Sequence, residues 1–185
     1  MTGEGTLKIL LTGRPGIGKT TALLKIIEEC KKMGLKIGGM VTKEVREGPS
    51  RTGFELIDIA TGKKGILASI YILEGPRVGK YRVDLRSLSE LGSMSIKNAV
   101  LHADIVFIDE IGPMELFSRE FQEAVLYAFE SRKPLVGTVH RKAKNFKFTR
   151  FILDKYKPQI IELSYENRNK VPLLVVNYIK TLFKK

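Results

Sequence analysis

Cysteine is nearly missing from this chain of 185 residues, in which Cys30 stands alone. A single cysteine forms no disulfide within the chain and offers no thiolate cluster to a metal ion. Cys30 lies in an apolar stretch with helical spacing, so we expect a buried and unreactive thiol. Folds that depend on disulfides or on cysteine-bound metal are therefore excluded.

Long apolar runs are also missing. The longest, such as Ile105–Ile108, are far too short to span a bilayer. The first residues carry neither a basic segment followed by an apolar core nor a small-residue cleavage site. We therefore expect a cytoplasmic protein that has no membrane partner. The content of 43% hydrophobic and 28% charged residues is typical of a globular chain, and the length fits a single domain over residues 1–185.

Acidic residues are few relative to basic ones: 32 Lys and Arg against 20 Asp and Glu give a net charge of +12. The basic residues are spread along the chain among Glu residues, which favours a solvated surface over a nucleic-acid site. A surface rich in Lys and Glu with few Gln is typical of a high-temperature organism. The one dense basic segment, Arg141–Arg150, contains Phe146 and Phe148, which could stack on bases. Nucleic acid thus stays open as a partner, but we do not expect an obligatory one.

Apolar residues recur with alternating strand and helix periods along the chain. We expect strands at Leu7–Thr12, Lys36–Val45, Asp104–Asp109, Pro134–Val139 and Gln159–Leu163. We expect helices at Thr20–Met33, Leu85–Ala103, Arg119–Ser131, Phe148–Tyr156 and Asn169–Phe183. Such alternation predicts an α/β protein with three layers, α/β/α, around a mainly parallel central sheet.

Residues 47–83 follow a different pattern. Phe54–Ala60 alternates between apolar and polar residues, Thr61-Gly62 forms a turn, and Gly65–Ser69 returns as a second strand. This pattern predicts an antiparallel hairpin added to the parallel sheet. The following segment, Tyr71–Val83, is rich in Gly and contains Pro76, so we expect a loop there.

A phosphate-binding loop lies between the first strand and the first helix. Residues 13–20 match the pattern G-x-x-x-x-G-K-[ST]. The glycines let successive backbone N–H groups point at phosphate oxygens, and the helix that follows presents its positive end to the anion. The Lys reaches the β- and γ-phosphates, and the Thr hydroxyl is a ligand for Mg²⁺. The nucleotide-binding residues expected here are Gly13, Arg14, Pro15, Gly16, Ile17, Gly18, Lys19, Thr20 and Thr21.

A second acidic element ends the most apolar strand, where Asp109 and Glu110 follow Asp104–Ile108. An Asp at the carboxyl end of such a strand holds Mg²⁺, usually through water, and would meet the phosphate loop at that edge of the sheet. Glu110 is suited to orient or deprotonate a water that attacks the γ-phosphorus, so it favours hydrolysis over transfer. We assign catalysis to Glu110 and Lys19, and the metal to Thr20 and Asp109. The nucleotide-binding residues expected on this strand are Ile105, Val106, Phe107, Ile108, Asp109, Glu110, Ile111 and Gly112.

Further candidates flank these two elements. Thr138 and His140 end the next apolar strand, where either side chain could sense the γ-phosphate or hold the water, although a lone His more often has a structural role. Arg46, Arg51 and Arg168 are candidates for stabilising charge in the transition state. A structural ion pair is the alternative for each arginine, and Arg168 or the neighbouring Asn167 could instead contact the base or ribose.

These motifs together resemble the thermophilic nucleoside-triphosphatase family, whose animal members are called cancer-related nucleoside-triphosphatases. The resemblance spans nearly the whole chain and rests on residues 13–20, 42–46, 51–54, 78–83, 108–118 and 166–168. The strings RTGF and IDEIGPMELFS are its most specific parts. Arg82 departs from the family pattern, which has a small residue there, so we expect the local loop shape to differ. The resemblance implies a P-loop NTPase fold and Mg²⁺-dependent hydrolysis of ATP, GTP and other nucleoside triphosphates to the diphosphate and phosphate.

Two other functions remain open from the sequence. A nucleotide or small-molecule kinase would need a second substrate pocket and often an arginine-rich lid, for which Arg141–Arg150 is a candidate. A nucleic-acid-dependent ATPase would use the same basic segment. No motif specifies the preferred base or an oligomer, so a monomer is the simplest expectation.

Overall fold

One continuous sheet of nine strands runs through the part of the chain that the computed structural model describes, residues 6–184. Its strand order is β5-β6-β4-β3-β2-β7-β8-β1-β9. The strands are β1 (Lys8–Thr12), β2 (Ile37–Glu47), β3 (Ser50–Asp58), β4 (Lys64–Ser69), β5 (Arg77–Val78), β6 (Tyr81–Val83), β7 (Ile105–Ile111), β8 (Leu135–Val139) and β9 (Gln159–Glu162).

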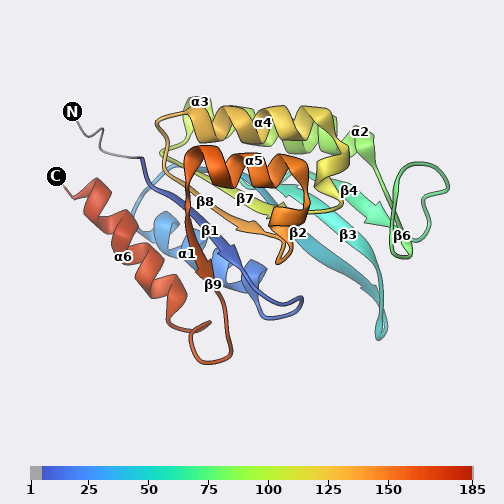
Figure 1. The fold of residues 1–185 in the computed structure, drawn as a ribbon, viewed down its shortest axis with the longest axis horizontal. Helices are drawn as coiled ribbons and strands as arrows, with labels where there is room; N and C mark the ends of the chain where they lie inside the picture. The colour runs from blue at the N-terminus through green and yellow to red at the C-terminus, as the bar shows by residue number, and fades with distance from the viewer. Residues whose placement is uncertain (1–5, 185) are drawn as a thin grey trace.

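The parallel half of the sheet contains β2, β7, β8, β1 and β9, and helices cover both of its faces (Figure 1). One face carries α1 (Lys19–Lys32) and α6 (Val171–Phe183), and the other carries α3 (Ser93–His102), α4 (Arg119–Glu130) and α5 (Lys147–Tyr156). Successive residues of β1 alternate between the faces: Ile9 and Leu11 join one buried cluster, and Leu10 joins the other. The predicted three-layer arrangement is therefore confirmed. None of the helices between residues 6 and 184 is both long and apolar enough to cross a membrane.

The antiparallel part is larger than the single hairpin expected from the sequence. The predicted pair is present as β3 and β4, and β2 also pairs with β3 along its outer length. The segment expected as a loop, Tyr71–Val83, instead contains β5 and β6. Gly79, with φ of +59°, makes the tight turn between these two strands. The loop expectation was wrong because each strand is so short that its pattern is hidden among glycines.

Arg82 lies in β6, where it pairs with Arg77 of β5, and its Nη1 donates to the carbonyl of Gly75 at 2.9 Å. The larger side chain is therefore accommodated in a strand. The positive φ at this turn belongs to Gly79 and not to residue 82.

Two further boundaries differ from expectation. The strand β7 continues past Asp109 to Ile111, with a shift of register against β8 between Ile108 and Ile111. The helix expected over 85–103 is divided into α2 (Leu85–Ser87), a π-helical turn (Leu88–Gly92) and α3. The division falls where Gly92 packs closely on Leu56, because a Cβ at Gly92 would lie 3.2 Å from the Leu56 Cδ2 atom.

The backbone of β7 leaves no space for a side chain at Gly39 of β2. Gly39 has φ of +111°, and a Cβ there would collide with the carbonyl oxygen of Phe107. Any larger residue would push the two strands apart. This contact fixes the position of Thr42, three residues further along β2, relative to Asp109 on β7.

Strand β1 begins at a half-buried lysine. The ammonium group of Lys8 donates to the carbonyls of Ala128 at 2.8 Å, Ser131 at 3.0 Å and Lys133 at 2.8 Å. These carbonyls belong to the end of α4 and the segment after it, where helical C=O groups have no partner of their own. The strand that leads into the phosphate-binding loop is thereby tied to the connection between α4 and β8.

Helix α4 begins at a side-chain N-cap, Ser118, which generates a stability test. The Ser118 hydroxyl accepts from the Phe121 N–H at 3.1 Å and is buried. Replacing Ser118 by Ala should lower the free energy of unfolding by about 1 kcal/mol, because a buried N–H loses its acceptor. For a chain of this size we expect a fall in Tm of about 2–4 °C, measured by calorimetry. The control Ser118→Thr keeps the hydroxyl; an Ala variant as stable as wild type would contradict the cap.

Candidate active site at the carboxyl edge of the parallel sheet

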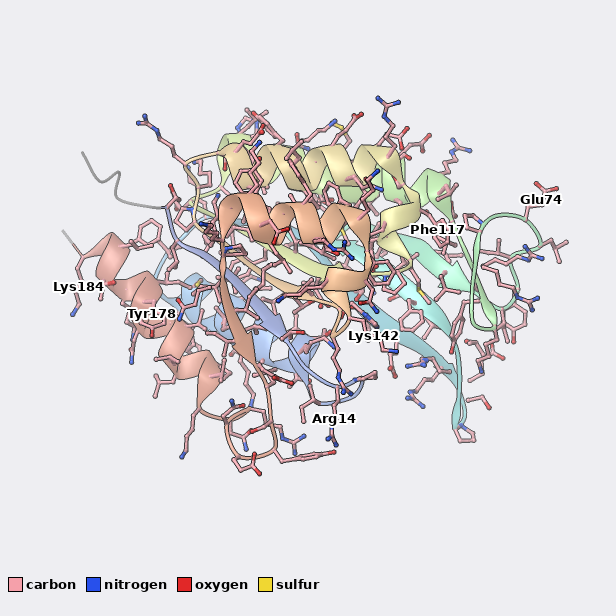
Figure 2. The ribbon with its side chains drawn as sticks, in the orientation of Figure 1. Arg14, Glu74, Phe117, Lys142, Tyr178 and Lys184 are labelled. Carbon is pink, nitrogen blue, oxygen red and sulfur yellow. The ribbon has the colours of Figure 1, made fainter. Side chains whose placement is uncertain are left out.

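The loop between β1 and α1 is shaped by glycines with left-handed backbone. Gly13, Gly16 and Gly18 have φ of +147°, +76° and +106°. The buried Ile17 side chain holds the loop to the core, while Arg14 points outward and is labelled at the lower edge of the molecule in Figure 2. Within the described residues no side chain caps the start of α1. The first N–H groups of this helix are therefore available to an anion, and the helix dipole favours one there.

The carboxylate of Asp109 lies at the centre of the site and is 1% exposed. The Thr20 hydroxyl donates to its Oδ2 atom at 2.9 Å and the Thr42 hydroxyl donates to the same atom at 3.1 Å. The Thr138 hydroxyl donates to Oδ1 at 2.5 Å. Asp109 thus joins α1, β2 and β8. Thr42 was not among the site residues predicted from sequence; the only signal was its place in the segment 42–46, which carries part of the family resemblance.

Lys19 and Glu110 form an ion pair directly beside this centre. The Lys19 Nζ atom lies 3.4 Å from Glu110 Oε2, and the two side chains are 11% and 22% exposed. Burial raises the pKa of Glu110, the Lys19 charge opposes this rise, and the Asp109 carboxylate adds to it. The ammonium group of the phosphate-binding loop and a largely buried carboxylate can therefore both contact a ligand bound between them.

A second buried acid, Glu115, lies close to this pair. It is 5% exposed and begins a short 3₁₀ helix, Glu115–Phe117. Burial, reinforced by the nearby Glu110 charge, holds the pKa of Glu115 well above its usual range. Sequence reasoning assigned it no role. The only signal was its place in the string IDEIGPMELFS, where a charged residue stands among apolar ones.

These groups line one cavity of about 620 Å³, a volume typical of small-molecule sites. One end is formed by the phosphate-binding loop together with Lys19, Thr20, Asp109 and Glu110. The other end extends across β2 to the antiparallel strands and the segment after β7. The apolar residues that line it are Leu24, Val41, Phe54, Ile57, Leu67, Val78, Pro113 and Met114.

His140 also lines this cavity and is half-buried. Its Nδ1 atom accepts from the Lys142 N–H at 3.2 Å, and its ring meets Phe146 edge-on with centroids 5.8 Å apart. Burial, and then the positive charges of Lys19 and Lys142, lower the pKa of His140. The imidazole is therefore neutral near pH 7, with Nε2 as its remaining hydrogen-bonding atom.

The candidate arginines lie in different surroundings. Arg46 and Arg51 each contact Glu44 at 2.7 Å, and Arg51 also donates to the Tyr81 hydroxyl at 2.9 Å. Both are thus engaged in ion pairs on the antiparallel strands.

Arg168 is nearer to the phosphate-binding loop. Its Nη1 atom donates to the Ile17 carbonyl at 3.4 Å, and its guanidinium stacks on the Tyr165 ring at 5.0 Å from the centroid. The neighbouring Asn167 closes its own turn, because its amide accepts from Ser164 N–H and donates to Glu162 C=O.

Most of the residues predicted on β7 do not face the cavity. Of residues 105–112 only Asp109 and Glu110 line it, whereas Ile105, Val106, Phe107, Ile108 and Ile111 are buried in the two hydrophobic clusters. A strand buried on both faces sends its alternate side chains into two cores, and only its carboxyl end reaches the sheet edge. Gly112 is buried against the Glu110 side chain.

The basic segment has less exposed aromatic surface than base stacking would need. Phe146 packs on His140, and Phe148 packs against the core beneath α5. Both rings are half-buried. Nucleic-acid binding through this segment stays a prediction from the sequence.

The oxygen donors at Thr20 and Asp109 fit a hard divalent cation. The Asp109 carboxylate already accepts from three hydroxyl groups, so it is suited to contact a cation through water. The Thr20 hydroxyl donates its proton to Asp109, which leaves its oxygen lone pairs for a metal. Within residues 6–184 no group of three or more His, Cys, Asp or Glu side chains is arranged to hold a metal alone. A cation here would therefore be shared with a phosphate ligand.

Comparison with known proteins matches these features. A family model described as NTPase matches residues 8–176. The nucleoside-triphosphatase THEP1 of Thermofilum pendens is 46% identical over 173 residues, which cover 94% of this chain and 95% of the relative. The corresponding protein of Methanocaldococcus jannaschii is 44% identical, with coverage of 94% and 97%.

Two solved structures share the fold over 97% of this chain and 100% of their own. They are the crystal structure of THEP1 from Aquifex aeolicus, with a TM-score of 0.81 and 32% identity, and the solution structure of a human cancer-related nucleoside triphosphatase, with 0.82 and 33%. The fold is thus that of P-loop nucleoside-triphosphatases, in agreement with the loop at residues 13–20. With the family model covering most of its length, the chain belongs to the NTPase family.

Proposed function

We propose that this protein hydrolyses nucleoside triphosphates, ATP and GTP among them, to the diphosphate and phosphate in the presence of Mg²⁺. The observation that carries the proposal is the ion pair of Lys19 and Glu110 beside the hydroxyl–carboxylate pair of Thr20 and Asp109. The first pair supplies a cation for phosphate and a carboxylate for water. The second supplies oxygen ligands for the metal.

Binding begins at the phosphate-binding loop. The free N–H groups at the start of α1 receive the phosphate oxygens, and Lys19 moves from Glu110 to the β- and γ-phosphates. Thr20 and Asp109 would hold the divalent cation, which would supply positive charge to the bound triphosphate. The buried hydrogen bonds from Thr42 and Thr138 keep the Asp109 carboxylate in one orientation.

Glu110 performs the step that separates hydrolysis from binding. Once Lys19 has turned to the phosphates, the Glu110 carboxylate accepts a hydrogen bond from a water molecule in the cavity. The water oxygen attacks the γ-phosphorus, the bond from this phosphorus to the bridging oxygen breaks, and the water proton passes to Glu110. The diphosphate leaves with the charge on its terminal oxygen stabilised by Lys19. Partial burial strengthens Glu110 as a base, because it destabilises the charged form.

The nucleoside fits on the β9 side of the loop. Tyr165 is 71% exposed and lies under the Arg168 guanidinium, next to the Ile17 carbonyl of the loop. A flat exposed ring stacks on any base, because every base has a π face. The nearby Asn167 amide is occupied by its own turn. This arrangement supports tolerance of different bases.

The first prediction tests the loop. Lys19→Ala should abolish measurable hydrolysis and weaken triphosphate binding, because it removes the cation that reaches the transferred phosphate. Thr20→Ala should chiefly raise the Mg²⁺ concentration needed for half-maximal rate. Phosphate release and nucleotide titration measure both, with the exposed Lys25→Ala on α1 as the control. Hydrolysis at the wild-type rate in Lys19→Ala would refute the site.

The second prediction tests Glu110. Glu110→Gln keeps the size of the side chain and removes its basicity, so kcat should fall about 10²-fold while triphosphate affinity stays near wild type. Asp109→Asn should impair both Mg²⁺ affinity and turnover. Rapid-quench analysis of the Gln variant should recover intact triphosphate from the bound complex. If this variant keeps kcat within about threefold of wild type, another group activates water, and His140 is the next candidate.

The third prediction compares arginines. Arg168→Ala should raise KM for ATP about tenfold, the effect of losing one charge-assisted contact beside the loop. Arg46→Ala should keep kcat within about twofold, because its guanidinium is engaged by Glu44 and the Pro49 carbonyl. Steady-state kinetics of both variants decide the matter. A tenfold loss of kcat in Arg46→Ala would mean that the β2–β3 ribbon moves onto the phosphates during turnover.

A further inference from the structure

The triphosphate, the metal and the attacking water would occupy only part of the cavity. Its far end is lined by Phe54 of β3, Leu67 of β4, Val78 of β5, and Pro113 and Met114 after β7; we call these five residues the apolar end. A phosphate chain and its metal are hydrophilic and gain nothing from such walls. Water alone would bind poorly against them, since apolar surface is stabilised by an apolar occupant.

The order of the strands places the nucleoside elsewhere. The loop after β1 lies between β8 on one side and β9 on the other. The apolar end lies beyond β7 and β2, across the site of the γ-phosphate from the loop. The exposed Tyr165 follows β9 and so lies on the opposite flank. A triphosphate whose terminal phosphate meets Lys19 and Glu110 has its base at the β9 flank, and the apolar end stays free.

In the part of the chain that the structure describes, three glutamates line the cavity, and Glu110 is the one that lies beside the phosphate end. Glu115 lines the cavity at the apolar end, and Glu110 stands between it and the phosphate end. Glu44 also lines the cavity, but its carboxylate is engaged by Arg46 and Arg51. A ligand that satisfies Glu110 therefore carries a hydrogen-bond donor on an apolar body. A hydroxyl group held at Glu110 occupies the place that the attacking water takes in hydrolysis.

We propose that the apolar end binds a second substrate, a small molecule with an aromatic or branched aliphatic body and a hydroxyl group, and that the enzyme transfers the γ-phosphoryl group to this hydroxyl. The inference rests on the proposed function, because it uses the same bound triphosphate. The hydroxyl oxygen forms a bond to the γ-phosphorus, and the bond from this phosphorus to the bridging oxygen breaks. The hydroxyl proton passes to Glu110, and the products are a phosphate monoester and the nucleoside diphosphate.

The experiment measures how the phosphoryl group divides between water and an alcohol. The wild-type protein is incubated with Mg²⁺ and ATP, with benzyl alcohol, 2-phenylethanol or 3-methyl-1-butanol as the acceptor. Phosphorus NMR then quantifies ADP, inorganic phosphate and phosphate monoester. Toluene is the matched control, because it fills an apolar site and has no hydroxyl. With at least one alcohol, monoester should account for ADP formed in excess of inorganic phosphate.

Two filling variants locate the acceptor. Val78→Trp, on the short edge strand β5, and Met114→Phe, after β7, add volume at two separate walls of the apolar end. Each should lower the ratio of monoester to ADP at least about fivefold and leave the KM for ATP within about twofold of wild type. Tyr165→Ala, on the β9 flank, should raise the KM for ATP and leave the ratio of monoester to ADP unchanged. Circular dichroism confirms that each variant is folded, and either filling variant alone suffices for the test.

The outcomes separate the two claims. Equal amounts of ADP and inorganic phosphate with all three alcohols would overturn the second-substrate site and leave hydrolysis standing. A raised KM for ATP in the filling variants, with unchanged KM in Tyr165→Ala, would also overturn it and assign the apolar end to the nucleobase. Absence of ADP from every reaction would instead refute the proposed function.

Discussion

The rest of the site depends on one buried carboxylate. Asp109 accepts hydrogen bonds from Thr20, Thr42 and Thr138, which come from the first helix and from the strands on either side of β7. A carboxylate that is 1% exposed is costly unless its oxygens are satisfied, so these hydroxyls are required by burial as much as by chemistry. These hydrogen bonds hold the strands in place, so that Lys19 can turn to phosphate and Glu110 to water without moving β2, β7 or β8.

How much of this arrangement can be predicted from the sequence depends on whether the information is local. The phosphate-binding loop is contiguous, and the pair Asp109-Glu110 follows a clearly apolar strand, so both could be proposed from the sequence. Thr42 and Glu115 were not assigned roles, because each belongs to the site only through a contact made by tertiary structure. Thr42 contacts Asp109, which is distant in the sequence, and Glu115 lies near Glu110 after the chain leaves β7. The parallel core was predictable because apolar residues recur with strand and helix periodicity over whole elements. The strands β5 and β6, of two and three residues, carry too little pattern to detect.

Strand β2 serves two structures at once. Residues 37–40 pair in parallel with β7, and residues 40–47 pair with β3; this second part presents Thr42 to the Asp109 carboxylate and carries Glu44. The contact at Gly39 fixes the first part. Glu44, held between Arg46 and Arg51, stiffens the second. The sequence identified both arginines as candidates for stabilising charge or forming an ion pair, but it did not reveal that one carboxylate, two and seven residues away, engages both. The antiparallel strands are thus a continuous extension of the catalytic sheet and not a separate module.

The two ends of the sheet have a consequence for the behaviour of the protein at high concentration. A sheet edge exposes unpaired N–H and C=O groups that can recruit another chain. Here the outermost strands are β5, with two residues, and β9, with four, so each border presents only a few such groups. A wide sheet that narrows to short borders offers little template for intermolecular strand addition. The short borders of the sheet therefore limit aggregation by strand addition.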